Sequence, residues 1–267
     1  MVTIVMPAFN ELDIIERTVR DWYDQVVATL PGSELLVVDD CSTDGTGEVL
    51  ERLAAQLPAV RIVRPAHNGG HGKALRFGFR QTEAEYIFQT DSDEQHLPSE
   101  FWDLWALKEK DFVFGIRKDR ADGMLRVAIT CSMRILNFII WGIWIRDANC
   151  PFKLMRRDAL ERVLPKISED CFIPMVEVSI LSRKMKFTLA EVSVTHLARR
   201  GGTQSLKGVM RWIRVGAMCA RQLLSLRLQF RTDPTLTSGA ATCLESAHNN
   251  TAEAPTIAMT SNRKPIK

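Results

Sequence analysis

Polar, acidic clusters follow apolar runs directly at three places in the N-terminal half of the chain. The runs are 2–6, 35–38 and 86–90, and the clusters are 7–11, 39–46 and 91–95. In open parallel α/β sheets, ligands bind beyond the carboxyl ends of the strands. This order therefore predicts that the three clusters meet at one edge of such a sheet and line a crevice of the nucleotide-binding type.

The pattern between the clusters predicts the rest of the fold. Strands are expected at 2–6, 35–38, 60–63, 86–90, 112–114 and 187–194. Helices are expected at 15–30, 46–57, after 73, from 98, 124–145 and 172–185. Alternating strands and helices indicate an α/β fold with a mainly parallel central sheet flanked by helices. With 267 residues, 46% of them hydrophobic, the chain can bury one sizeable core.

The third cluster contains side chains that hard metal ions prefer. In an extended segment, Asp91, Asp93 and Gln95 would all point to one side of the backbone. Two carboxylates and an amide oxygen suit Mg²⁺ or Mn²⁺. Short patterns of this kind also occur in ordinary turns, so a solvated loop is the alternative for this motif alone.

A glycine-rich loop runs from His67 to Lys73 and matches neither common phosphate-binding pattern. His67 stands where a P-loop has its first glycine, and Leu75 takes the last glycine position of the dinucleotide pattern. Both of those folds are therefore disfavoured. The loop either brings Lys73 and backbone amides toward a phosphate or makes a tight turn between a strand and a helix.

Charge is distributed unevenly although the net charge is only +3, which does not indicate a nucleic-acid partner. The region between Glu191 and Asp233 has no acidic residue. One face of a helix there would carry Lys207, Arg211, Arg214 and Arg221. The opposite face would carry Val209, Ile213, Ala220, Leu223 and Leu224. Such a helix suits an anionic membrane surface; a core-packed helix with a solvated basic face is the alternative.

The sequence also indicates where in the cell the protein is expected. The apolar run 135–145, interrupted by Asn137, is shorter than the roughly 18–20 residues of a spanning helix. The six cysteines include no Cys-x-x-Cys pair and fit a reducing compartment, and the N-terminus shows no export signal. We therefore expect a cytoplasmic protein peripherally associated with the membrane, partly because 135–145 is rich in Trp. Residues 232–267 are expected to be disordered.

Four motifs together resemble those of family 2 glycosyltransferases with the GT-A fold, and most closely the polyprenyl-phosphate sugar synthases. They are Pro7–Glu11, Val38–Thr46, Asp91–His96 and Phe152–Leu154. The resemblance covers about residues 1–230. We therefore expect a GT-A glycosyltransferase domain over 1–196. The basic loop and amphipathic helix over 197–231 would form a region that contacts the membrane surface or the acceptor, and the tail follows at 232–267.

The resemblance also implies roles for individual residues. The base and ribose of a nucleotide diphosphate-sugar would lie against Pro7, Ala8, Phe9, Glu11, Val38 and Asp40. Asp91, Asp93 and Gln95 would hold Mg²⁺ or Mn²⁺ against the diphosphate, and Ser92 between the aspartates would contact the donor without binding the metal. Asp93 and Arg117 are the candidate catalytic residues, and Arg117 and Arg199 would bind donor and acceptor phosphates.

The chain departs from the family pattern at four positions. Phe9 replaces a tyrosine, Ser92 and Glu94 replace the commoner Ala and Leu, and Pro151 replaces a small residue. These departures leave the identity of the donor's sugar and base undetermined, whereas the implied reaction stays the same.

The implied reaction is metal-dependent, inverting transfer of a hexose to a polyprenyl (dolichol-type) phosphate, which needs no general base. A soluble family 2 enzyme acting on a glycan or protein hydroxyl is the first alternative, with Asp170 or Glu177 as its base. A non-catalytic nucleotide-sugar-binding or membrane scaffold protein is the second. Lys153 either faces the acceptor or is a surface lysine after a turn.

Overall fold

The computed structural model of the protein describes residues 1–118, 124–198 and 209–232. In these residues one sheet has the strand order β3-β2-β1-β4-β6-β5-β7. The strands are β1 (Val2–Ala8), β2 (Glu34–Asp39), β3 (Val60–Val63), β4 (Tyr86–Gln89), β5 (Phe112–Lys118), β6 (Lys153–Arg156) and β7 (Leu189–Thr195). Neighbouring strands are parallel except where β6 pairs with β4 and β5. The predicted α/β fold with a mainly parallel sheet is confirmed.

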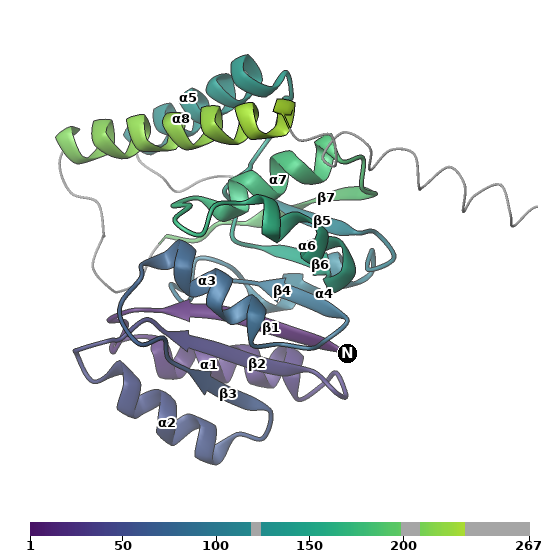
Figure 1. Cartoon of the computed structure of the whole chain (residues 1–267). Coiled ribbons are helices and arrows are strands. Elements are labelled where there is room, and N and C mark those ends of the chain that lie inside the picture. The colour runs from purple at the N-terminus through teal and green to yellow at the C-terminus, as the bar shows by residue number, and fades with distance from the viewer. Residues whose placement is uncertain (119–123, 199–208, 233–267) are drawn as a thin grey trace, which may run out of the picture.

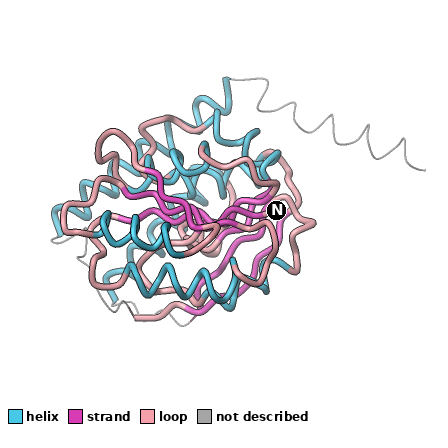
Figure 2. Tube along the Cα trace, turned by 90° about the horizontal axis from the view of Figure 1, so that it is seen from below, coloured by secondary structure: helices cyan, strands magenta, loops and turns pink. Residues whose placement is uncertain are grey.

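Helices cover both faces of the sheet, so the strands form a middle layer (Figures 1 and 2). One face is covered by α1 (Ile15–Trp22), α2 (Thr46–Gln56) and α4 (Phe101–Trp105), with a π-helical turn at Tyr23–Val27 and a 3₁₀ turn at Pro98–Glu100. The other face is covered by α3 (His71–Arg80), α6 (Arg157–Val163) and α7 (Pro174–Lys184), with a 3₁₀ turn at Leu164–Lys166.

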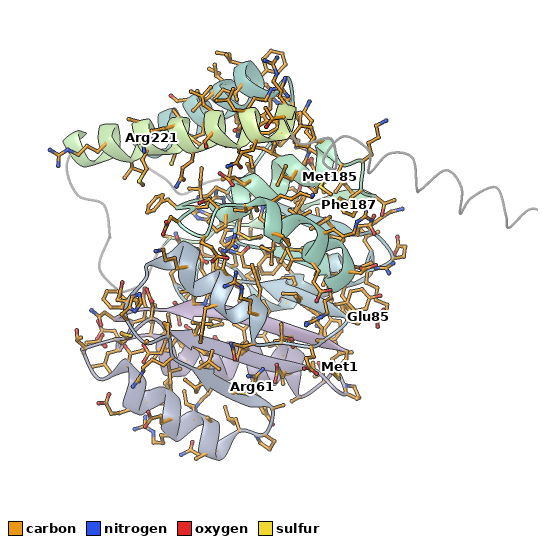
Figure 3. The ribbon with its side chains drawn as sticks, viewed as in Figure 1. Met1, Arg61, Glu85, Met185, Phe187 and Arg221 are labelled. Carbon is orange, nitrogen blue, oxygen red and sulfur yellow. The ribbon has the colours of Figure 1, made fainter. Side chains whose placement is uncertain are left out.

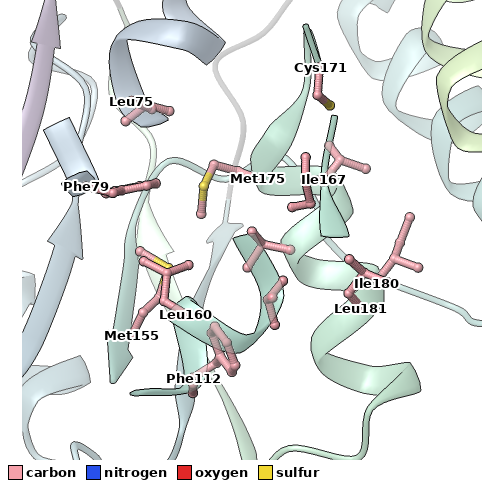
Figure 4. Packing of buried hydrophobic residues seen from close by; sticks show 14 of the residues in the cluster. Leu75, Phe79, Phe112, Met155, Leu160, Ile167, Cys171, Met175, Ile180 and Leu181 are labelled. Atoms are coloured by element: carbon pink, nitrogen blue, oxygen red, sulfur yellow. The ribbon is translucent and has the colours of Figure 1, made fainter. Parts of the chain in front are cut away.

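Strand β1 shows why the apolar runs lack alternation. Its residues Ile4 and Met6 pack into the core under α1 and α2, whereas Val5 between them packs into the core under α3. Side chains alternate across a strand, so a strand covered on both faces is apolar throughout. Figure 4 shows the second of these cores, where Leu75 and Phe79 of α3 lie near Leu160 and Met175.

The remaining helices, α5 (Met124–Trp141) and α8 (Val209–Thr232), lie side by side at one end of the molecule (Figure 1). The Trp141 ring of α5 contacts Phe230 of α8 at 5.7 Å between centroids. Figure 3 shows Arg221 on α8, and its side chain is exposed. Leu223 is buried as predicted, but Leu224 is half exposed, so its predicted place on the packed face is wrong.

Strand β6 was not predicted. It is four residues long, its first residue is a buried lysine, and it runs antiparallel between two strands that precede it in the chain. Because its pairing depends on β4 and β5, no local periodicity reveals it. The helix predicted over 124–145 ends earlier, at Trp141, where Gly142 has a φ of 66°. The tail predicted to be disordered lies, from residue 233, outside the described residues.

We expect Gly78→Ala to destabilise the protein by about 1–3 kcal/mol, because overpacking forces backbone or rotamer shifts. A Cβ at Gly78 of α3 would lie 2.6 Å from Cγ1 of Val5 and 2.8 Å from Cγ2 of Val38. Urea unfolding measures the change. The control is Gly216→Ala on the exposed side of α8, where a Cβ meets nothing within 4 Å and a gain of up to about 1 kcal/mol is expected. Equal stability of Gly78→Ala and wild type would contradict this packing.

Candidate active site

The loops after β1 and β2 interlock at the carboxyl edge of the sheet. The Asn10 backbone N–H donates to Ser42 Oγ at 3.0 Å, and the Thr43 backbone N–H donates to Asn10 Oδ1 at 2.8 Å. The Glu11 backbone N–H donates to Thr46 Oγ1 at 3.0 Å. Two of the three predicted clusters therefore meet, and each satisfies backbone groups of the other.

Two adjacent carboxylates after β2 face different partners. Asp39 is buried and accepts from Arg64, with Nη2 at 2.6 Å, and from the Ser42 backbone N–H at 2.9 Å. Asp40 accepts the backbone N–H groups of Gly69 and Gly70 at 2.9 and 2.8 Å. Asp40, predicted beside the base and ribose, thus also holds the glycine-rich loop at this edge.

The six residues predicted around the base and ribose differ in exposure. Phe9 is exposed, whereas the other five are buried in β1, β2 or the loops that follow: Pro7, Ala8, Glu11, Val38 and Asp40. The exposed Phe9 ring is therefore the side chain of this set that is accessible to a planar base, and it lacks the hydroxyl of a tyrosine.

The segment with the two aspartates is a loop rather than an extension of the strand. β4 ends at Gln89, and Glu94 has a φ of 57°, a left-handed conformation. The expected alternation of side chains along an extended segment is therefore wrong. The loop is nevertheless ordered by hydrogen bonds, because the Gln95 backbone N–H donates to Asp93 Oδ1 at 3.2 Å.

Three neighbouring segments hold this loop. Gln95 Nε2 donates to the Leu197 carbonyl at 3.0 Å, and the Leu197 N–H donates to the Gln95 carbonyl at 2.9 Å. From α1, Arg17 forms an ion pair with Glu94, and Thr18 Oγ1 donates to the Ser92 carbonyl at 3.3 Å. From α3, His71 Nε2 lies 3.7 Å from Asp91 Oδ1. Arg17 is not among the residues predicted from the sequence, and its partner Glu94 is one of the departures from the family pattern.

The donor set of this loop fits a hard divalent cation. Asp91 and Asp93 supply carboxylates, and Gln95, whose Nε2 donates to the Leu197 carbonyl, has an amide oxygen that can serve as a third ligand. Across the described ranges, no group of three or more His, Cys, Asp and Glu side chains gathers as a metal site. The two aspartates with an amide oxygen therefore remain the candidate set.

Arg117, at the end of β5, pairs with Asp147. Its Nε and Nη2 donate to Asp147 Oδ2 and Oδ1 at 2.8 and 2.9 Å. His96 directly follows the aspartate loop, and its pKa is lowered to about 3 by burial and then by the Arg117 charge. Arg117 lies at the same edge of the sheet as this loop, because β4 and β5 both run antiparallel to β6. The second predicted phosphate ligand, Arg199, lies outside the described residues.

Both interpretations of Lys153 are wrong, because its side chain is buried beneath the site. Nζ donates to the Ala148 carbonyl and to Ser179 Oγ, both at 3.0 Å, and lies over the Phe114 ring. Burial lowers the pKa of Lys153 to about 8.

The two candidate general bases lie in opposite environments. The Asp170 side chain is 84% exposed and pairs with Lys73 Nζ at 2.7 Å. Lys73 therefore contacts a carboxylate of the protein itself. Glu177 of α7 is buried, and desolvation raises its pKa to about 7, opposed by the Cys171 thiol and by Arg76.

The fold is of the GT-A type. A solved structure of glucosyl-3-phosphoglycerate synthase from Mycobacterium tuberculosis, in complex with Mn²⁺, UDP-glucose and phosphoglyceric acid, matches this chain with a TM-score of 0.61. The match covers 85% of this chain and 79% of that chain at 20% sequence identity. It establishes the architecture, namely a mixed sheet between layers of helices.

The sequence itself defines the family. The model of glycosyl transferase family 2 matches residues 3–164, and the chain belongs to this family of glycosyltransferases. An undecaprenyl-phosphate mannosyltransferase of Micrococcus luteus is 26% identical over 78% of this chain and 88% of its own length. A dodecaprenyl-phosphate galacturonate synthase of Rhizobium johnstonii is 28% identical over 80% of this chain, which spans 63% of that relative.

We expect Glu177→Gln to remove a pH-dependent loss of stability. The pKa of Glu177 is raised in the folded protein from 4.5 to about 7, so its contribution is fully present below about pH 4.5 and is lost as the pH rises through 7. Wild type should therefore lose up to about 3 kcal/mol relative to the variant between pH 5 and 8. Urea unfolding at both values measures this, with the exposed Glu83→Gln as control. A constant difference across pH would contradict the assignment.

Proposed function

We propose that the protein transfers a hexose, with inversion, from a nucleotide diphosphate-sugar to a polyprenyl phosphate. The observation that carries the proposal is that Asp91 and Asp93, on a loop ordered by hydrogen bonds and an ion pair, share one edge of the sheet with Arg117. Carboxylates that bind a cation and an arginine that binds phosphate are what a diphosphate leaving group requires.

The donor end of the site follows from the first two clusters. Phe9 stacks on the base, while Asp40 and the backbone of Pro7 and Ala8 border the base and ribose. Asp91, Asp93 and Gln95 would hold Mg²⁺ or Mn²⁺, which when bound neutralises charge that grows on the diphosphate. Arg117 and Arg199 donate charge-assisted hydrogen bonds to phosphate oxygens of donor and acceptor. The Mn²⁺ and UDP-glucose bound by the structural neighbour are consistent with this donor chemistry.

A lipid phosphate as acceptor is supported by two observations. The names of the relatives contain undecaprenyl phosphate and dodecaprenyl phosphate. A phosphate oxygen is already nucleophilic at neutral pH, whereas a hydroxyl acceptor needs a base. Of the two candidate bases, Asp170 is solvent-exposed and occupied by Lys73, and Glu177 is buried in the core. The site therefore favours an acceptor that needs no proton removed.

The helices α5 and α8 supply a surface suited to an anionic membrane. On α5, Ile135, Phe138 and Ile139 share one exposed face, with Ile139 73% exposed, while the polar Asn137 is buried. On α8, Arg221 shares its exposed face with Leu224 and Leu228. Apolar side chains facing outward with basic residues among them match the boundary between lipid headgroups and acyl chains. Within the described ranges, no helix is both long enough and apolar enough to cross a bilayer.

The transfer assay tests the reaction. With polyprenyl phosphate, Mn²⁺ and radiolabelled nucleotide-sugars, wild type should form a lipid-linked sugar, and EDTA should abolish it. Asp91→Ala and Asp93→Ala should each lower turnover by about 100-fold or more, because the charge on the diphosphate is then left uncompensated. Asp103→Ala, an aspartate on α4, is the control. Transfer that survives EDTA, or variants with wild-type turnover, would refute the metal assignment; hydrolysis of the donor without lipid transfer would favour a hydroxyl acceptor.

Vesicle flotation tests the surface. Wild type should float with vesicles of phosphatidylglycerol and phosphatidylcholine. Ile139→Ser combined with Leu228→Ser should lower binding by at least about 10-fold, because burial of a large aliphatic side chain contributes about 1.5–3 kcal/mol. Arg214→Gln combined with Arg221→Gln should weaken binding mainly to anionic vesicles, more so at low salt. Indifference of wild type to lipid would favour the soluble alternative.

A further inference from the structure

We propose that Asp147 is a positioning residue for Arg117. Lys153 and Ser179 in turn hold the chain segment that carries Asp147. The inference rests on the proposed function in one respect, namely that Arg117 binds a phosphate of the donor or acceptor. Asp147 itself contacts Arg117 rather than substrate, so its effect on the reaction passes through the arginine.

The Asp147 carboxylate holds both the side chain and the backbone of Arg117. Besides the contacts to Nε and Nη2, Oδ2 accepts the Arg117 backbone N–H at 3.3 Å. The guanidinium has five N–H donors, and this pair uses two of them. Because the two groups meet as parallel planar forks, the plane of the guanidinium is set before a phosphate arrives.

Side chains from β6 and α7 fix the segment around Asp147. The Ala148 carbonyl accepts from Lys153 Nζ at 3.0 Å and from Ser179 Oγ at 3.2 Å, and Lys153 Nζ also donates to Ser179 Oγ. Lys153 is the register partner of Phe114 on β5, and Arg117 is the next-to-last residue of that strand. The arginine and its carboxylate are therefore both anchored to the β5–β6 pair and to α7.

The burial of this pair argues for orientation rather than stability. The side chains of Arg117 and Asp147 are 14% and 2% exposed. Removing two charges from water offsets most of their attraction, so a buried ion pair is weak evidence for stability. Holding a long, flexible side chain in its binding conformation does reduce the entropic cost of binding a ligand. The pair thus fits a preorganised phosphate ligand.

A double-mutant cycle tests the proposal. Calorimetry measures binding of UDP and GDP with Mn²⁺ to wild type, Asp147→Asn, Arg117→Lys and the double variant, and the transfer assay gives KM and kcat for each. We expect Asp147→Asn to weaken nucleotide binding or transfer by about 10- to 100-fold, the cost of a misplaced group. The double variant should be no weaker than Arg117→Lys alone, because Asp147 acts only through Arg117. The control Asp158→Asn, in a surface pair with Arg156, should match wild type.

Four outcomes would overturn the assignment. Losses that add in the double variant show that Asp147 acts independently of Arg117. Tighter nucleotide binding by Asp147→Asn shows that the carboxylate competes with phosphate. Loss of one limb of the pH profile of transfer in Asp147→Asn shows that the carboxylate transfers a proton. A lower melting temperature with unchanged binding and transfer per folded molecule shows a structural role. If wild type binds neither nucleotide, the proposed function itself fails, which is a separate result.

Discussion

Buried carboxylates that accept hydrogen bonds from neighbouring loops hold the functional edge of this sheet together. A carboxylate removed from water is tolerated only when its oxygens are satisfied. Asp39 meets this need with Arg64 and Ser42, and Asp40 with two backbone N–H groups of the glycine-rich loop. Because loops of different strands share these acceptors, the edge is built as one unit.

The antiparallel strand β6 connects this edge to the second half of the chain. It lies between β4, which leads to the aspartate loop, and β5, which carries Arg117 as its next-to-last residue. Its first residue, Lys153, reaches the carbonyl next to Asp147, so one buried lysine links the strand to the partner of the arginine. The aspartate loop and Arg117 are therefore both set by strands that flank β6 in one sheet.

The exposed faces of α5 and α8 bear on where the proposed reaction takes place. Helices α5 and α8 pack on each other and expose apolar side chains together with arginines. In a globular protein that faces water on all sides, an inward Asn137 beside outward Ile135 and Ile139 would be the reverse of the usual arrangement. With a lipid surface on that side, the same arrangement is favourable. A reaction between a water-soluble donor and a lipid phosphate requires such a boundary.

The sequence by itself determined the α/β fold, the strands of its first half and the meeting of clusters 7–11 and 39–46. These follow from periodicity and from the order of strand and polar cluster, which depend on near neighbours in the chain. Only the tertiary structure decided that Lys153 is buried, that residues 91–95 form a loop, and that Arg117 pairs with Asp147, 30 residues away. The reason is that these features depend on the insertion of β6 and on contacts between distant segments, which no local pattern encodes.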